Sequence, residues 1–478
     1  MTGSDSRHVV VVGGGLAGIA AAIELRDAGI AVTVLEARPW LGGATCSFSR
    51  NGLTIDNGQH VFLRCCTGYR ALLDRLGMAG SVTLQDRFDV TVLTPRGRAR
   101  LRRNGLPAPL HMAGALARYS LLSPGDRLRV ARAALAMRFI RPTDPRLDGL
   151  RLGDWLGARG QREQARRRLW DLFTVSTLNV AGDEASVALA AKVIKTALLQ
   201  GSDAADIGVP AIPLGRLHGQ AAEGLLSRLG ADVRLGAKAA AVEPAADGGF
   251  RVRLAARADG SEDTDLRADG VILAVPAWNA ARLAADTVPA AADWARLEPS
   301  PIVNVHVIYD RRVTELPFAA AVDSPVQWVF DKTQQAGAAA GQYLVVSLSA
   351  ADDYIDLPSA TLRAQFLPAL CQLFPAALKA EVMDFFVTRE RRATFRQAPG
   401  CGRLRPPAAT SATRLMLAGA WTDTGWPDTM EGAVRSGVTA AHLMQRELAP
   451  AAGSQVGRAA GPGRPGRSRP RAAAGTPS

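Results

Sequence analysis

The sequence predicts an α/β fold in which one parallel sheet is assembled from separate stretches of the chain, with an α+β region inserted between them. Residues 8–12 form a short apolar run rich in valine, which is typical of a buried parallel strand. A glycine-rich turn, a helix-like stretch ending near Gly29 and a second strand over 31–35 follow, so a βαβ unit is complete within about thirty residues. Near the other end of the chain, residues 414–418 form another buried strand, which leads into a glycine turn and a helix over 430–446.

The turn after the first strand carries the pattern Gly13-x-Gly15-x-x-Gly18, in which each glycine has a physical role. The first makes the tight turn, the second lets the backbone approach a diphosphate, and the third lets the helix pack on the strand. The N-terminus of that helix adds free N–H groups and the positive end of its dipole. Glu36 ends the second strand, where a carboxylate accepts hydrogen bonds from a ribose diol and repels a 2′-phosphate. The pattern predicts a Rossmann-like domain that binds an adenine dinucleotide, without distinguishing NAD from FAD.

Between these two ends, strand-like and helix-like stretches alternate. Helical periodicity is found at residues 126–139, 186–199, 217–229 and 361–373. Apolar runs typical of strands are found at residues 90–93, 231–235, 239–242, 250–255, 270–275, 302–309 and 343–349. The mixture, together with the length of 478 residues, indicates two or three domains.

Composition and charge exclude several classes of protein. A hydrophobic content of 47% and a charged content of 21% are ordinary for a soluble globular chain. No stretch is long and apolar enough for a spanning helix, and the N-terminus carries no signal peptide, so we expect a cytoplasmic protein. Residues 450–478 contain five arginines and no acid, and therefore supply +5 of the net charge of +13. We expect residues 448–478 to form a disordered basic tail, because they have almost nothing to bury.

Arginines and cysteines bear on possible partners. Five arginines cluster in one short segment, at Arg96, Arg98, Arg100, Arg102 and Arg103. Such a cluster suits nucleic acid or anionic lipid, but the chain has no nucleic-acid-binding motif and few aromatic side chains to stack on bases. We therefore expect no nucleic-acid partner, and a solvated or lipid-facing edge instead. The five cysteines show no CxxC spacing, which indicates neither a disulfide framework nor a metal site.

Further glycine-containing segments distinguish FAD from NAD. Leu41-Gly42-Gly43 follows Glu36 closely, and residues 56–62 read Asp-Asn-Gly-Gln-His-Val-Phe. Residues 415–437 contain Ala-Gly-Ala-Trp-Thr-Asp and Thr-Met-Glu-Gly-Ala-Val-Arg-Ser-Gly. Together these segments resemble the extended FAD fingerprint of the amine oxidase and phytoene desaturase superfamily. The resemblance implies an FAD cofactor held without a covalent bond, because no attachment motif for a covalent flavin is found.

The same resemblance implies an FAD site built from both ends of the chain. The glycine pair near residue 42 passes the phosphate and ribityl chain, and Ala239 contacts the adenine through its backbone. Asp423 bonds the ribityl or phosphate region, while Met430 and Glu431 lie near the ring. The predicted cofactor-binding residues are Gly13, Gly15, Leu16, Ala17, Gly18, Glu36, Ala37, Gly42, Gly43, Gly58, Gln59, His60, Ala239, Gly419, Asp423, Thr429, Met430 and Glu431.

Four strings narrow the resemblance to one family. Residues 57–77, 173–180, 389–400 and 418–437 look like the squalene-associated FAD-dependent desaturases, which are the hydroxysqualene dehydroxylase family of hopanoid biosynthesis. The resemblance covers residues 7–447 and implies that a reduced flavin replaces the allylic hydroxyl of hydroxysqualene by hydride, which yields squalene. The reductant of the flavin is unknown. Oxidation of a polyprenoid or an amine is the alternative within this fold, and a non-catalytic FAD-stabilised carrier of prenyl lipid is the alternative of another class.

His60 is the one histidine within a motif next to the predicted flavin. An ordinary pKa of about 6.5 suits a donor of the proton that the leaving hydroxyl needs. The alternative is a structural histidine that orders its loop.

The resemblance also divides the chain into domains. The FAD-binding domain comprises residues 1–85, 205–290 and 401–447, and the α+β substrate-binding domain comprises residues 86–204 and 291–400. Because the implied substrate is a long apolar isoprenoid, we expect an apolar cavity to which residues 173–180 contribute. We also expect transient contact with the inner face of the cell membrane through helix 126–139. Its apolar stripe comprises Leu128, Ala131, Leu135 and Phe139, and a core helix with solvated arginines is the alternative.

Overall fold

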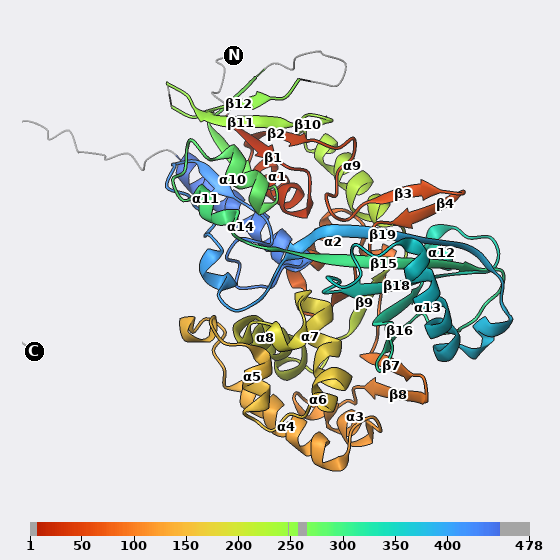
Figure 1. Ribbon diagram of the computed structural model, residues 1–478. Coiled ribbons are helices and arrows are strands. Elements are labelled where there is room, and N and C mark those ends of the chain that lie inside the picture. The colour runs from red at the N-terminus through yellow and green to blue at the C-terminus, as the bar shows by residue number, and fades with distance from the viewer. Residues whose placement is uncertain (1–6, 247, 257–264, 450–478) are drawn as a thin grey trace, which may run out of the picture. The chain divides into compact units, whose positions relative to one another are not determined.

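The computed structural model describes residues 7–246, 248–256 and 265–449 (Figure 1). Up to Leu448 the chain belongs to one compact unit. The predicted tail, residues 448–478, lies outside the described residues except for its first two positions. The α-helices are α1 (Leu16–Asp27), α2 (Thr67–Arg75), α3 (Ala113–Arg118), α4 (Pro124–Arg138), α5 (Leu152–Gly157), α6 (Glu163–Ala165), α7 (Asp171–Leu178), α8 (Val187–Ile194), α9 (Ala221–Arg228), α10 (Ala277–Leu283), α11 (Ala291–Trp294), α12 (Thr333–Ala336), α13 (Ser359–Leu373) and α14 (Met430–Leu448). The strands are β1 (His8–Val12), β2 (Ala31–Glu36), β3 (Ser47–Arg50), β4 (Leu53–Asp56), β5 (Phe62–Leu63), β6 (Val82–Leu84), β7 (Asp89–Thr94), β8 (Gly97–Arg102), β9 (Ile207–Pro210), β10 (Asp232–Leu235), β11 (Ala239–Pro244), β12 (Phe250–Leu254), β13 (Leu266–Ala268), β14 (Gly270–Leu273), β15 (Pro299–Tyr309), β16 (Phe318–Ala321), β17 (Trp328–Asp331), β18 (Gln342–Ser349), β19 (Val382–Phe395) and β20 (Leu415–Leu417).

A five-stranded parallel sheet, in the order β10-β2-β1-β14-β20, is built from strands that are far apart in the sequence. Successive valines of β1 point to opposite faces, and both faces are covered. Val9 and Val11 pack with α1 and α14, whereas Val10 and Val12 pack with the small sheet β11-β12-β13 and with α10. All strands end at one edge, where ligands of open parallel sheets bind.

Glycines allow the N-terminal and C-terminal helices to lie against their neighbours. A Cβ atom at Gly18 would lie 1.9 Å from the carbonyl oxygen of Gly13, so only glycine lets α1 approach the turn after β1. A Cβ atom at Gly437 of α14 would lie 2.1 Å from the carbonyl oxygen of Ala17. This close approach brings the last helix beside the first, and both ends of the chain therefore meet at the carboxyl edge of the sheet.

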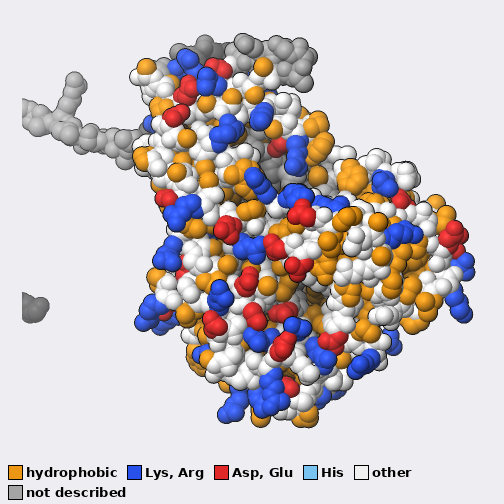
Figure 2. All heavy atoms as spheres, viewed as in Figure 1, with side chains coloured by type: hydrophobic (Ala, Val, Ile, Leu, Met, Phe, Trp, Pro, Cys, Tyr) orange, Lys and Arg blue, Asp and Glu red, His pale blue; other side chains and the backbone are white. Residues whose placement is uncertain are grey.

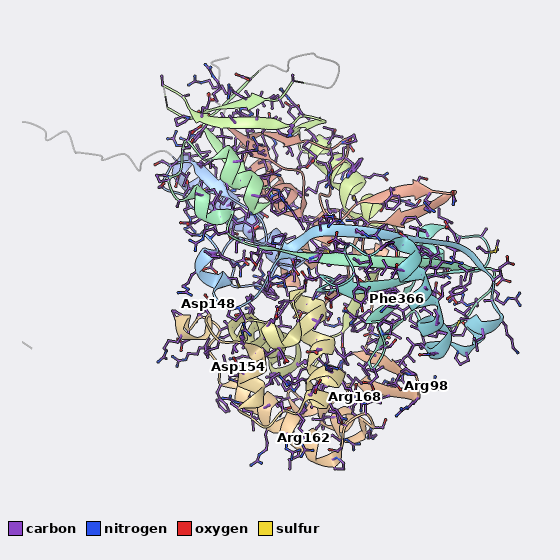
Figure 3. The ribbon with its side chains drawn as sticks, viewed as in Figure 1. Arg98, Asp148, Asp154, Arg162, Arg168 and Phe366 are labelled. Carbon is purple, nitrogen blue, oxygen red and sulfur yellow. The ribbon has the colours of Figure 1, made fainter. Side chains whose placement is uncertain are left out.

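A seven-stranded sheet, in the order β19-β15-β18-β17-β16-β7-β8, forms the second half of the molecule. Its neighbouring strands are antiparallel except for β16 and β7. Helix α13 covers one face, where Phe366 is completely buried with its ring 5.7 Å from that of Tyr354 (Figure 3). The other face packs against helices α4, α5, α7 and α8.

Polar contacts fasten the helical region to both sheets (Figure 3). The carboxylate of Asp148 accepts the Gly402 N–H at 3.0 Å, and the neighbouring Cys401 packs with Leu415 and Leu417 of β20. Arg168 forms an ion pair with Asp323 at 2.8 Å, beside β16. The helices are therefore held between the two sheets, where they form one wall of the cavity described below.

The α/β class predicted from the sequence is confirmed, and each predicted helix and strand has a counterpart within a few residues. Helix 186–199 differs in detail, because α8 continues as a π-helical turn, η6 (Lys195–Gln200). The strands of the parallel sheet all come from the stretches assigned to the FAD-binding domain, and those of the seven-stranded sheet from the stretches assigned to the substrate-binding domain. The boundaries themselves stay a prediction. Within residues 7–246, 248–256 and 265–449, no helix has the length and apolar character needed to cross a membrane.

Candidate active site

A cavity of about 530 Å³ opens at the carboxyl edge of the parallel sheet and extends to the seven-stranded sheet and to α7 and α8. At the sheet edge it is lined mainly by turns, most of which contain glycine or come from the two ends of the chain. These lining segments are Gly15–Ala17, Gly42, Gly58–His60, Ala274–Ala277, Gly419–Trp421 and Trp426–Glu431. The cavity therefore joins the predicted cofactor site to the predicted substrate domain.

The turn before α1 forms an open cradle. Gly15 has an ordinary extended backbone, and α1 begins after it with no side-chain cap and no acidic residue in its first turn. The N–H groups of that first turn have no helical partners, which suits a diphosphate. The nearest atom to a Cβ built on Gly15 would be the Cα of Gly43 at 3.8 Å, so the space before Gly15 is free.

Glu36 lies where the fingerprint predicts it, at the end of β2. Its buried carboxylate accepts the Gly14 N–H at 2.7 Å and the Arg38 N–H at 2.8 Å, which fixes both oxygens beside the glycine turn. Each oxygen keeps a lone pair for a ribose hydroxyl. The uncapped amides, the open space at Gly15 and the held carboxylate all fit the diphosphate and ribose of FAD.

Residues 415–437, the C-terminal block, close the cradle from the other side. Gly419 has a φ of 141°, and a Cβ there would lie 2.4 Å from the indole Nε1 of Trp421, so glycine is required. The Trp421 indole donates to the carbonyl of Val275 at 2.9 Å. The Thr429 hydroxyl accepts the Gly432 N–H at 3.3 Å and so caps α14, whose first residue, Met430, lines the cavity.

The structure brings most of the predicted cofactor residues to the cavity. Those that line it are Gly15, Leu16, Ala17, Gly42, Gly58, Gln59, His60, Gly419, Thr429, Met430 and Glu431. Gly13, Gly18 and Gly43 instead shape the turns behind the lining, as Glu36 does. Ala37 is exposed at the end of β2 and takes no part in the lining.

The surroundings of Asp423, Ala239 and Glu431 could not be predicted from the sequence. Asp423 is exposed and outside the cavity, because its N–H donates to the Pro406 carbonyl and its carboxylate turns to the Gly425 N–H. Ala239 lies in the buried strand β11 and outside the lining, so its adenine contact stays a prediction. Glu431 reaches the cavity, but its carboxylate accepts the N–H groups that begin α2, that of Tyr69 at 2.7 Å among them. These bonds join α14 to α2, and the position of Glu431 near the flavin ring stays a prediction.

His60 faces the cavity from the loop between β4 and β5. Burial is the main influence on the ring and lowers its pKa, although Asp56 nearby acts in the opposite direction. The Nδ1 atom lies 3.4 Å from the Gly58 carbonyl oxygen, a long contact. The imidazole is therefore neutral near pH 7, which makes it a poorer proton donor than its ordinary pKa predicts.

A buried network holds this loop. Asp56 accepts hydrogen bonds from Ser47 at 2.6 Å, from the Leu214 N–H at 2.9 Å and from Gln335 at 2.7 Å. Lys332, 5% exposed, forms an ion pair with the same carboxylate at 3.4 Å. These contacts join both halves of the molecule at the residue that begins the His60 loop.

Three polar cavity residues went unnoticed in the sequence. Asn304 of β15 is 1% exposed and donates to the Asn57 carbonyl at 3.3 Å, while its Oδ1 has no partner among the described residues. Lys192 of α8 lies over the ring of Trp426 at 4.7 Å. Asp428 precedes Thr429 directly. Of these three residues, only Asp428 could have been found from the sequence, because it lies within the C-terminal block. Asn304 and Lys192 reach the cavity only through the fold.

The far part of the cavity is apolar. Its walls come from β7 and β8, from α7, from α8 with η6, and from β16 and β17. The large apolar residues are Phe88, Val90, Leu101, Leu172, Phe173, Val193, Ile194, Leu198, Phe318, Trp328 and Phe330. The segment 173–180 contributes as the sequence predicts, with Phe173, Ser176, Thr177 and Asn179 in the lining.

Comparison with known proteins identifies the family. Residues 16–445 match the model of the flavin containing amine oxidoreductases. A hydroxysqualene dehydroxylase of Rhodopseudomonas palustris is 32% identical over 92% of this chain and 98% of its own length. The chain belongs to the hydroxysqualene dehydroxylase family of flavin-containing amine oxidoreductases. It is therefore an FAD-dependent oxidoreductase, as the glycine patterns predict.

More distant relatives share the fold. The zeta-carotene desaturase of Zea mays is 25% identical over 90% of this chain and 82% of its own length. Among solved structures, a cyclohexylamine oxidase from Brevibacterium oxydans has a TM-score of 0.70 at 19% identity, with 93% of this chain and 99% of that chain covered. At that identity the likeness confirms the fold and carries no information on the substrate.

Proposed function

We propose that this chain reduces hydroxysqualene to squalene with FAD held without a covalent bond. The observation that carries the proposal is the continuity of one cavity, which runs from the glycine cradle into walls of apolar side chains. A long uncharged isoprenoid fits such walls, because burying its hydrocarbon surface there is favourable by about 25 cal/mol per Å². The related dehydroxylase of Rhodopseudomonas palustris carries this activity in its name.

FAD, when bound in its reduced state, would supply the hydride that replaces the hydroxyl. The residues of the chain have three tasks around it. Glycine turns and the first turn of α1 hold the diphosphate, the apolar walls hold the isoprenoid and exclude water, and a cavity residue supplies a proton to the departing oxygen. His60 is the candidate from the sequence for the last task, and its lowered pKa argues for a different donor.

Anaerobic oxidation of the reduced enzyme tests the proposal. We expect hydroxysqualene to restore the oxidised flavin spectrum without oxygen, with squalene as the product by mass spectrometry. Phytoene and a simple amine serve as control substrates with the oxidised enzyme, and neither should bleach the flavin. Bleaching by phytoene or by the amine, with hydroxysqualene inert, would favour the desaturase or oxidase alternative. Binding of the isoprenoid with no change of the flavin spectrum would favour the carrier.

We also propose that α4 contacts a membrane surface, which is where the substrate dissolves. The face that α4 turns to the core contains Val130, Ala133 and Met137. The predicted apolar stripe points outward, with Leu128 61% exposed and Phe139 78% exposed. This separation supports the membrane interpretation over the core alternative, since an outward apolar stripe beside arginines suits an anionic interface. Figure 2 shows Lys and Arg side chains with hydrophobic ones between them at the end where Figure 1 places α3 and α4.

A further inference from the structure

Asp428 lies at the junction of the two parts of the cavity. It belongs to the loop between β20 and α14, and the neighbouring residues from Trp426 to Glu431 all line the cavity. On one side this loop follows the Gly419 turn of the cradle. On the other side, the ammonium group of Lys192 lies over the ring of Trp426 at 4.7 Å. Lys192 belongs to α8, which contributes to the apolar part of the cavity. A carboxyl group at this position borders both parts of the cavity.

Hydrogen bonds hold Asp428 in one orientation. Its Oδ2 atom accepts the Phe395 N–H at 2.9 Å, and its own N–H donates to the side-chain oxygen of Gln397 at 3.1 Å. Gln397 is completely buried and is fixed in turn by donation to the Leu178 carbonyl at 2.8 Å. In the part of the chain that the structure describes, the Oδ1 atom has no hydrogen-bond partner, so it is free to act on a molecule in the cavity.

The surroundings of Asp428 favour the neutral acid. Burial raises its pKa to about 6, with the Phe395 N–H and Arg405 opposing that shift. Arg405 forms no ion pair with it among the described residues, because its guanidinium donates to the carbonyls of Ala420 at 3.0 Å and Thr422 at 2.5 Å. Lys192 and Arg435 are directed at the ring of Trp426. Among the described residues, no cation forms an ion pair with Asp428, and the effect of Arg405 is smaller than that of burial.

Two other titratable groups of the cavity, Glu431 and His60, are less suitable donors. Glu431 is committed to α2 and to Arg435, with which it forms an ion pair at 2.6 Å. His60 is neutral, because burial lowers its pKa. Burial acts on both His60 and Asp428 in favour of the neutral form, and only for a carboxyl group is the neutral form the one that carries an acidic proton.

We propose that Asp428 is the acid that protonates the leaving hydroxyl. This inference rests on the proposed function. The C–O bond of the allylic alcohol breaks with its electron pair on oxygen, the Oδ1 proton forms the new O–H bond, and water departs. Reduced FAD, when bound, would be the reductant of the step and would supply the hydride that the carbon needs. Asp428 is left as a carboxylate and regains a proton from solvent before the next turnover.

This role is tested by measuring how fast hydroxysqualene oxidises the reduced holoenzyme. The rate is recorded by anaerobic stopped flow at several pH values. In the wild type the rate should be constant below about pH 6 and fall about tenfold per pH unit above it, as the acid form is lost. Asp428→Asn should slow oxidation by about 10²–10⁴-fold and remove that pH dependence. Asp428→Glu should restore part of both. His60→Gln and Lys192→Met should each retain the fall in rate above pH 6.

Two further measurements are independent of turnover. FAD affinity and the flavin spectrum should be the same in Asp428→Asn as in the wild type. A raised pKa means that the folded protein holds the proton more tightly than the unfolded chain. Asp428 therefore stabilises the fold at low pH and loses that effect as the pH rises through about 6. The Tm of the wild type should consequently fall relative to that of Asp428→Asn between about pH 4 and about pH 7.

The outcomes separate the inference from the function on which it rests. A wild-type enzyme that hydroxysqualene cannot oxidise contradicts the dehydroxylase function itself. A wild-type enzyme that works, beside an Asp428→Asn variant with a rate within about threefold or with the same pH dependence, overturns the role of Asp428. Loss of FAD from that variant overturns it too, since Asp428 would then be a cofactor ligand. If the pH dependence is lost in His60→Gln or in Lys192→Met but kept in Asp428→Asn, the proton donor is His60 or Lys192 instead.

Discussion

The two ends of the cavity are built by different means. At the cofactor end, glycine turns and the first turn of α1 form part of the surface, together with side chains such as those of His60 and Met430. At the substrate end, residues with large apolar side chains from α7, η6, β7 and β17 line the cavity. The first surface recognises a charged diphosphate and the second excludes water from a hydrocarbon.

This difference determines how each end responds to substitution. Backbone recognition needs glycine at fixed positions, so a single added methyl group can fill the space of the ligand. An apolar wall is made of many side chains, and each contributes only part of the contact with the substrate. We therefore expect large, all-or-none effects at the cofactor end and graded effects at the substrate end.

The largest effect is expected at Gly15. Its backbone is extended and the space beside it is open, so the Gly15→Val variant should fold normally. Its affinity for FAD should nevertheless fall by more than about 100-fold, because the valine side chain occupies the diphosphate site. The flavin absorbance of the purified protein and its apoprotein Tm measure the two effects. Gly18→Val is the matched control: its Cβ would lie 1.9 Å from the Gly13 carbonyl oxygen, so it should unfold the domain instead. A normal yellow holoprotein from Gly15→Val would contradict the site.

Glu36→Ala should have the next largest effect. FAD affinity should fall by roughly 1–3 kcal/mol, because a charge-assisted hydrogen bond to the ribose is lost. Titration calorimetry with the apoprotein gives the value. Since the carboxylate also holds the N–H groups of Gly14 and Arg38, Glu36→Gln serves as the control that keeps one acceptor for the turn. Unchanged affinity in both variants would mean that Glu36 only shapes the loop.

A graded effect is expected at the substrate end. Ser176 of α7 lines the cavity and its side chain is exposed there, so Ser176→Phe narrows the channel without disturbing the core. We expect kcat/KM for hydroxysqualene to fall by about tenfold with FAD affinity unchanged. Val175→Phe, one residue away and outside the lining, should leave kcat/KM near the wild-type value. Equal effects of the two variants would show that the channel does not pass α7.

The smallest effect concerns the outer surface of α4. Leu128→Glu and Phe139→Glu together should reduce flotation with anionic liposomes a few-fold, because an exposed apolar stripe is replaced by charges that an anionic surface repels. Turnover of substrate in detergent should not change. Leu378→Glu, at a residue that is 73% exposed and lies beyond α13, is the matched control. Flotation that is insensitive to the α4 pair would remove this helix from consideration.

Much of the cofactor end could be predicted from the sequence, because its recognition groups are local. The spacing of Gly13, Gly15 and Gly18 in one turn, with Glu36 at the next strand end, is visible without any tertiary contact, and the structure places all four as expected. Asp423 shows the limit of such reasoning. It lies in the expected block, but a backbone hydrogen bond to Pro406 turns the segment outward, and no local pattern contains that contact.

By itself the sequence determined the α/β class, the FAD cradle and the membership of the family, since these depend on short-range geometry and on patterns within single segments. Only the tertiary structure decided which side chains share the cavity. Asp428 and His60 come from opposite ends of the chain, and Lys192 and Asn304 come from its middle, yet all four line one space. The structure also decided the protonation of Asp428, His60 and Lys192, because the pKa of each depends on how deeply the fold buries it and on which charges it places nearby.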